Sequence, residues 1–105
     1  MVAVGYHAGK ALTTGLYNVF VGMTAGDAAT EADHNTHVGY AAGSAVTTGN
    51  DNTLIGSYAG SATTTGAENT FIGRSAGAAN TTASYNTAIG HIALAQLLQV
   101  MIILL

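Results

Sequence analysis

Two histidines three residues apart, His34 and His37, form the one pair in the chain whose spacing is typical of metal ligands. Glu31 and Asp33 are the only carboxylates close to them in sequence. This shell is too sparse for zinc, so we expect both histidines to be ordinary surface residues. A metal site would require a trimer that brought three His37 side chains together at its axis. The other two histidines lie far from this pair in the sequence: His7 and His91.

Five tyrosines are the other side chains with recognisable chemistry. An exposed aromatic ring can stack on a sugar, and it can equally fill a gap between neighbouring chains. No set of Ser, His and Asp recurs, so we expect no enzymatic activity and no cofactor. The tyrosines are Tyr6, Tyr17, Tyr40, Tyr58 and Tyr85.

Pairs of adjacent threonines suggest the hypothesis of ice binding, which needs a flat and regular array of hydroxyl groups. Neighbouring residues of a strand point to opposite faces, so both members of a pair cannot lie in one plane. Thr30-Glu31 also interrupts the series. Both points disfavour this function. The pairs are Thr13-Thr14, Thr47-Thr48, Thr64-Thr65 and Thr81-Thr82.

Composition excludes several classes of protein. The 105 residues carry a net charge of −3 and only two basic side chains, so we expect no binding of nucleic acid. There is no Cys, which excludes disulfides and thiolate metal sites. The apolar run 94–105 is shorter than the roughly 20 residues of a membrane-spanning helix. We therefore expect a chain that does not span a membrane.

The glycines show that these side chains sit on a repeat. Five full units of 17 residues cover 2–18, 19–35, 36–52, 53–69 and 70–86, and a sixth begins at Thr87. No unit contains an insertion or a deletion, which is strong evidence for stacked, identical coils. The first glycine of each unit defines the spacing: Gly5, Gly22, Gly39, Gly56, Gly73 and Gly90.

Each unit is predicted to form a short strand followed by tight turns. The motif Thr-x-Ile-Gly is β-branched on one face and ends at a glycine, which can adopt a positive φ. Several glycines in every unit disfavour a helix. The sequence therefore predicts an all-β solenoid, or β-roll, with one coil per unit. Successive coils would pair at about 4.8 Å.

Recurring columns are expected to hold the coils together. An apolar residue precedes each of these glycines and should form a thin spine lining the coil: Val4, Val21, Val38, Ile55, Ile72 and Ile89. An asparagine ends each full unit and should form an amide ladder that donates to and accepts from the coils above and below: Asn18, Asn35, Asn52, Asn69 and Asn86. The column of recurring threonines should do the same with its hydroxyls.

The narrow core predicts association. A coil lined by Val, Ile and Ala buries little apolar surface, so three chains around one axis would pool their spines. We expect a homotrimer, with stacking of trimers end to end as a further possibility. We divide the chain into a solenoid over 1–90 and an apolar tail over 91–105. The tail is expected to be helical and to act in trimerisation or capping.

The unit Asn-Thr-x-Ile-Gly-x-x-Ala-Gly-x-x-x-Thr-Thr-Gly-x-x resembles the shaft repeat of phage tail fibres. Residues 52–68 and 69–85 match it most closely. Shorter repeats of a similar kind occur in the heads of trimeric autotransporter adhesins. The resemblance implies a homotrimeric structural rod of a virion or of the cell exterior. The alternative is an adhesin-like module that contacts host glycans through its variable Tyr and His residues.

Overall fold

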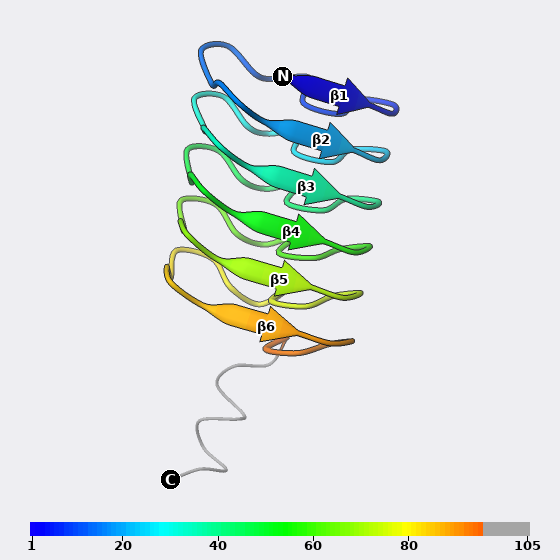
Figure 1. Ribbon diagram of the computed structural model, residues 1–105, viewed down its shortest axis with the longest axis vertical. Helices are drawn as coiled ribbons and strands as arrows, with labels where there is room; N and C mark the ends of the chain where they lie inside the picture. Colours follow the sequence, from blue (N-terminus) through cyan, green and yellow to red (C-terminus); the bar gives the residue numbers. More distant parts are fainter. Residues whose placement is uncertain (96–105) are drawn as a thin grey trace, which may run out of the picture.

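The structure is a computed structural model that describes residues 1–95. Six short parallel strands form one sheet in the order of the sequence (Figure 1). The predicted all-β solenoid is confirmed, with each strand 17 residues after the one before. The strands are β1 (Val2–Val4), β2 (Val19–Val21), β3 (Thr36–Val38), β4 (Thr53–Ile55), β5 (Thr70–Ile72) and β6 (Thr87–Ile89).

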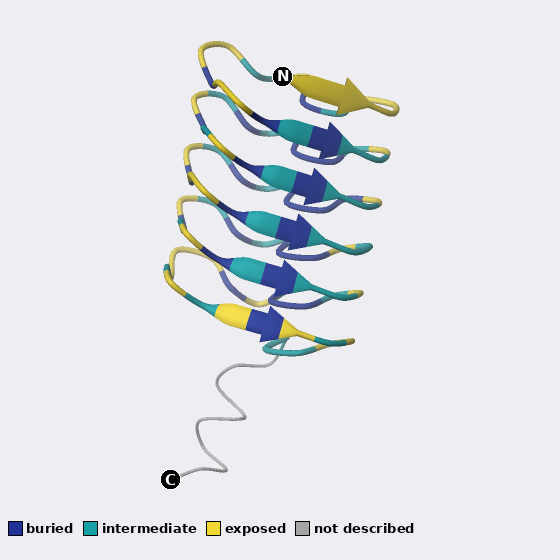
Figure 2. Cartoon of the chain, in the orientation of Figure 1, coloured by how far each residue is buried: buried dark blue, intermediate teal, exposed yellow. Residues whose placement is uncertain are grey.

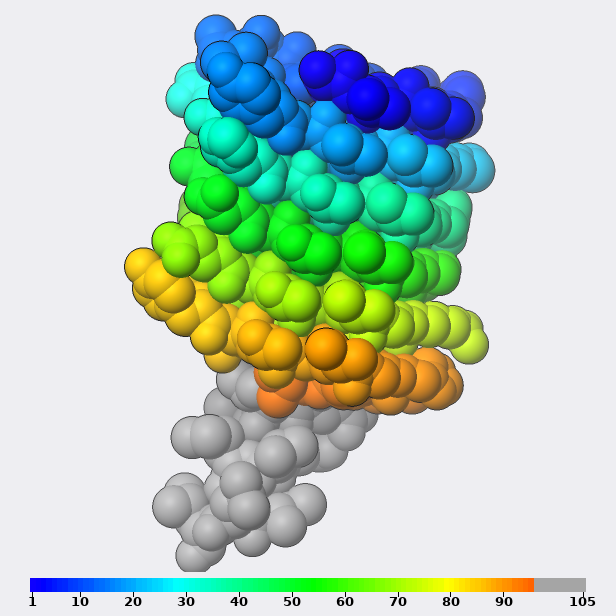
Figure 3. All heavy atoms as spheres, viewed as in Figure 1, coloured from blue at the N-terminus to red at the C-terminus, as the bar shows by residue number. Residues whose placement is uncertain are grey.

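Every strand pairs only with its sequence neighbours, and the pairing never slips. Val4 lies opposite Val21, Val21 opposite Val38, and the same rule holds through Ile72 and Ile89. Equivalent residues therefore stack in straight columns along the solenoid axis. In the space-filling view the coils form even layers (Figure 3).

Tight turns close each coil after its strand. In the third coil the amide of Ala42 donates to the carbonyl of Gly39 at 3.2 Å, and the amide of Ser44 donates to that of Ala41 at 3.2 Å. Ala41 has a φ of 56° and Gly43 one of 58°. A positive φ at the third residue is typical of type II turns.

The glycine that ends each strand is required by the close approach of the coils. Gly39 has a φ of 133°, which only glycine adopts readily. A β-carbon at Gly39 would lie 2.6 Å from the carbonyl carbon of Gly56 in the next coil. The recurrence of this glycine is thus a condition for stacking at the spacing of a sheet.

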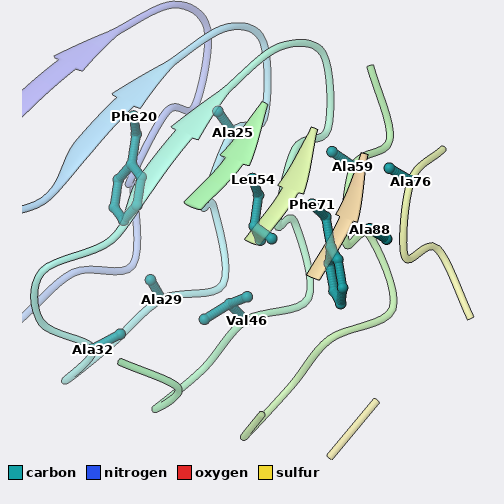
Figure 4. Close-up of a cluster of buried hydrophobic side chains, with 10 residues drawn as sticks. All are labelled: Phe20, Ala25, Ala29, Ala32, Val46, Leu54, Ala59, Phe71, Ala76 and Ala88. Atoms are coloured by element: carbon teal, nitrogen blue, oxygen red, sulfur yellow. The ribbon is translucent and has the colours of Figure 1, made fainter. Parts of the chain in front are cut away.

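The interior is filled by the middle residue of each strand. The middle residue is buried in all strands but β1, and its neighbours are partly or fully exposed (Figure 2). We call these middle residues the core column: Ala3, Phe20, His37, Leu54, Phe71 and Ala88. Phe20, Leu54 and Phe71 pack against small residues such as Ala25, Ala59 and Ala76 (Figure 4).

The small residue opposite the strand leaves room for the core column. A β-carbon at Gly26 would lie 2.7 Å from the ring of Phe20, and one at Gly43 would lie 2.5 Å from the ring of His37. The Ala-Gly pair therefore recurs because a bulky side chain lies against it, from the same coil at Gly26 and Gly43 and from the next coil at Gly9, which faces Phe20.

Residues 91–95, which the sequence assigns to the tail, continue the sixth coil as turns. The amide of Gly77 donates to the carbonyl of Ala93 at 2.7 Å, so this segment stacks on the fifth coil. Leu94 replaces the usual glycine with a φ of 55°. The rest of the expected tail helix, over 96–105, lies outside the described residues. Across the described part of the chain, no helix is long and apolar enough to cross a membrane.

Candidate functional site

The apolar spine lies on the outside of the sheet. The prediction that Val and Ile line the coil is wrong. The core column, whose members directly precede these residues in each strand, lines the coil instead. Val4 is 58% exposed and Ile89 is 67% exposed, whereas Phe20, Leu54 and Phe71 are fully buried. The cause is the two-residue period of a strand, which sends adjacent side chains to opposite faces. Val4 and Ile89 belong to the two end coils, and the four members between them are partly buried by their neighbours. We call this outward-facing set the outer column: Val4, Val21, Val38, Ile55, Ile72 and Ile89.

A second column runs beside the outer column on the same face. It holds the first residue of each strand: Val2, Val19, Thr36, Thr53, Thr70 and Thr87. Neither column contains a charged residue. The two together form an uncharged surface of methyl groups and threonine hydroxyls along the sheet.

The asparagine ladder binds main chain rather than neighbouring amides. The Oδ1 atom of Asn52 accepts from the amide of Asn69 at 3.0 Å, and its Nδ2 atom donates to the carbonyl of Gly66 at 2.9 Å. Both partners belong to the following coil. Asn18, Asn35 and Asn69 make the equivalent pair of bonds, and all four side chains are buried. The ladder therefore holds neighbouring coils in register.

Two further columns of hydrogen bonds support the ladder, and the sequence reasoning singled out only one. The Thr47 hydroxyl donates to the carbonyl of Thr64 at 3.5 Å, as expected for the threonine column. The second column was missed. The amide of Leu16 donates to a carboxylate oxygen of Asp33, whose own amide donates to Oδ1 of Asn50 at 2.7 Å. The signal was a polar residue two positions before the ladder asparagine in several units.

The structure separates the two histidines with metal-like spacing. His34 is exposed at a corner and stacks on Tyr17, with ring centroids 4.8 Å apart. His37 is a fully buried member of the core column, so the expectation that it lies on the surface is wrong. Its burial also excludes a site built from three His37 side chains at a trimer axis. Residues 1–95 contain no group of three or more side chains able to hold a metal ion.

The His37 ring is held by packing alone. Neither ring nitrogen has a hydrogen-bond partner, and the ring of Phe20 lies 4.9 Å away, centroid to centroid. Burial lowers the pKa of His37 from 6.5 to about 3. The imidazole is therefore neutral at physiological pH, and charging it would place an unpaired cation in an apolar interior.

The tyrosines divide between two opposite edges of the coil. Tyr6, Tyr40 and Tyr58 lie on the turns that follow the strands, whereas Tyr17 and Tyr85 lie on the corner that precedes the ladder asparagine (Figure 1). Tyr40 and Tyr58 form an edge-to-face pair with ring centroids 5.2 Å apart. They are 45% and 41% exposed.

Four of the five carboxylates lie at the corner edge, and the fifth, Asp27, lies in the turns that follow β2. Glu31, Asp33, Asp51 and Glu68 all lie in the segment between the threonine column and the ladder asparagine. Arg74, by contrast, lies on the turn edge one coil beyond Tyr58. A hydrogen bond with Tyr40 is the main cause that raises the pKa of Tyr58, while the charge of Arg74 lowers that pKa. The phenol of Tyr58 thus lies within the field of the guanidinium.

These features define the protein as a parallel β-solenoid with a stacked 17-residue repeat. A search of family models, of curated proteins and of solved structures finds no match to the chain.

Proposed function

We propose that the chain is a structural protein: a rigid segment of a homotrimeric shaft in a phage tail fibre or another extracellular filament. The observation that carries this proposal is the outer column, an uninterrupted apolar stripe on the outer face of the sheet. The virion or extracellular setting rests on the resemblance of the repeat to tail-fibre shafts.

The outer column has the properties of a covered surface. An exposed apolar patch that runs the length of a domain commonly marks a contact with another protein. Both columns on this face lack charge, and their spacing from coil to coil is constant. A second copy of the chain, placed alongside in parallel, would meet an identical array at every level.

Three copies around an axis parallel to the solenoid would bury this face on every chain at once. The interior of each coil holds few large side chains: the large apolar ones that are fully buried are Phe20, Val46, Leu54 and Phe71, each in a different coil. Pooling three outer columns adds a second apolar core between the chains and stabilises a shape that is thin on its own. The number three comes from the resemblance, because fibres of this kind are homotrimers.

The stacked backbone suits a spacer. Each coil is hydrogen-bonded to its neighbours by strand pairing, by the turns and by the asparagine ladder. Bending the rod would break several of these bonds at one level. The chain therefore acts as a stiff element of fixed length, and no catalytic step is assigned to it.

Light scattering after size exclusion tests the assembly. We expect the 105-residue chain to have three times its own mass of 10.5 kDa. Ile55→Lys places a charge in the middle of the outer column and should give monomers. Thr65→Lys adds the same charge at an exposed position on the corner edge and should leave the trimer intact.

Circular dichroism separates loss of assembly from loss of folding. A monomeric Ile55→Lys variant should keep the β spectrum of the parent. A parent chain that is monomeric at all concentrations would overturn the proposal, and so would an Ile55→Lys variant that remains trimeric. If the parent chain is trimeric, negative-stain images of it show whether the trimers also join end to end.

A further inference from the structure

The turn edge of coils three to five carries an exposed aromatic pair next to a cation. Tyr40 and Tyr58 meet edge to face at 5.2 Å between centroids, and each keeps two fifths or more of its surface exposed (45% and 41%). Such a pair is geometrically ordered, because each ring limits the rotation of the other. It therefore offers a fixed apolar face with two phenolic hydroxyl groups at its rim.

The backbone holds Arg74 close to this pair. The amide of Tyr58 donates to the carbonyl of Tyr40 at 2.8 Å, and one coil further on the amide of Ser75 donates to that of Ser57 at 2.9 Å. These bonds stack the three turns directly on one another. Two coil steps span about 10 Å, so one small ligand can reach from the Tyr40 ring to the guanidinium of Arg74.

Charge is segregated around this site. The turns of coils three to five, residues 39–43, 56–60 and 73–77, contain no carboxylate. The carboxylates of these coils, Asp51 and Glu68, each directly precede a ladder asparagine, and the segments that lead into the strands form the opposite edge of the coil (Figure 1). The guanidinium of Arg74 forms no salt bridge with either of them in the structure, and its charge already acts on the phenol of Tyr58. An anionic group would therefore meet Arg74 without competition from a neighbouring carboxylate.

The three side chains together select one ligand chemistry. A pyranose ring presents a C–H face that packs on an aromatic ring, and its hydroxyls can bond phenols. A carboxylate on that sugar matches the planar donor fork of arginine. A nucleic-acid backbone would require several cations, and the chain has only two Lys and Arg in total. We propose that Tyr40, Tyr58 and Arg74 bind the carboxylated sugar of an anionic glycan.

Every residue of this site belongs to one chain. Binding therefore does not depend on the proposed trimer, and failure of either proposal leaves the other standing. In a trimer three such sites would face outward along one level of the rod. Their multivalency would strengthen attachment to a dense glycan surface without any new contact.

Titration with sialyllactose and with lactose tests the proposal, because the two differ by the carboxylated sugar. We expect the parent chain to bind sialyllactose and to bind lactose at least about tenfold more weakly, since a charge-assisted hydrogen bond supplies that discrimination. Arg74→Gln should weaken the binding of sialyllactose by about the same factor and leave lactose unchanged. Tyr40→Ala should weaken the binding of both sugars.

Two matched variants serve as controls. Lys10→Gln removes the only other Lys or Arg, and Tyr85→Ala removes an exposed tyrosine on the opposite edge. Neither should change sialyllactose binding, and the melting temperature of each variant shows whether it folds. Arg74→Gln changes only an exposed side chain, so it remains informative if Tyr40→Ala unfolds. Equal affinity for both sugars, no binding of either, or an equal loss in Lys10→Gln would overturn the proposal.

Discussion

The two faces of the same short strands obey opposite rules. The core column faces inward and varies from alanine to phenylalanine, and one of its members is a histidine. The outer column faces outward and is restricted to Val and Ile in all six strands. Within the strands, the variable position is therefore buried and the uniform position faces outward.

The difference teaches that recurrence alone does not tell which side of the coil a residue occupies, because the recurring alanines Ala25, Ala42 and Ala59 are fully buried. An interior residue has only to fill the space inside its own coil, where the volume of its opposite neighbours can adjust. The core column is matched by a second inward column of changing size: Leu12, Ala29, Val46, Thr63 and Asn80. An outer residue instead meets identical copies above, below and, in our proposal, on two other chains.

Adjacent residues on opposite faces give the largest expected contrast. Phe71→Ala removes a fully buried ring and should lower the free energy of unfolding by about 3–5 kcal/mol at every protein concentration. Ile72→Ala changes the outer column, so its effect should be smaller and should vary with concentration. Chemical denaturation at two concentrations measures both. Equal, concentration-independent losses would show that the two faces do not differ.

The asparagine ladder gives the next largest effect. Asn52→Ala would leave two main-chain groups of the following coil, the amide of Asn69 and the carbonyl of Gly66, without their hydrogen-bond partner. We expect the free energy of unfolding to fall by about 2–4 kcal/mol. Asn50→Ala removes a single bond, to the amide of Asp33, at an exposed corner, and should cost less than about 1 kcal/mol. Thermal melts of the two variants compare them. Equal midpoints would contradict the structural role of the ladder.

Acid sensitivity sharpens the contrast between inside and outside. Burial lowers the pKa of His37 to about 3 in the folded chain from its ordinary value of 6.5, and the inward columns of residues 1–95 carry no other ionisable group. As the pH falls below 6.5, the unfolded chain takes up a proton that the folded chain does not, so stability falls. We expect a loss of about 2.5 kcal/mol between pH 7.5 and pH 4.5.

Two substitutions isolate the contribution of His37 to this pH dependence. His37→Leu copies Leu54 of the next coil and should remove the dependence, whereas His34→Leu, at an exposed corner, should leave it unchanged. Unfolding by urea at the two pH values measures each variant. A pH dependence that survives in His37→Leu would contradict the assignment.

The smallest expected effect concerns backbone strain at the corner edge. Glu68 is exposed and has a φ of 57°, a conformation that costs a residue with a β-carbon about 1 kcal/mol. Glu68→Gly should therefore raise the free energy of unfolding by about 0.5–1 kcal/mol, because stacking holds this conformation whatever the side chain. Glu68→Gln keeps the β-carbon and should give no gain. A loss of stability in Glu68→Gly would show that the corner is not strained.

Much of the fold could be predicted from spacing alone. The interval between Gly5, Gly22 and Gly39 specified one coil per unit, the parallel pairing and the in-register stacking. The columns could be written down residue by residue, because a period without insertions places equivalent residues above one another. The ladder asparagines followed in the same way, although their partners are main-chain groups of the next coil.

The candidate surfaces were harder to predict. A three-residue strand has too few residues to show which face is apolar, and here both faces are. One signal was present: both phenylalanines of the chain, Phe20 and Phe71, occupy the middle of a strand. The grouping of Tyr40, Tyr58 and Arg74 also has a signal in the repeat, because Tyr40 and Arg74 follow the strand-ending glycines of units three and five and Tyr58 lies one position further on in unit four. The contact between the two tyrosine rings, however, is set by their side-chain conformations.

The sequence by itself determined the period, the strand and turn positions, and the columns that run along the solenoid, because these follow from local chemistry repeated at a fixed interval. Only the tertiary structure decided which column lies inside. A glycine opposite each strand leaves space for one bulky side chain, and the ring of Phe20 or His37 occupies it. That packing turns Val21 and Val38 outward, and it places an apolar face where another chain can reach it.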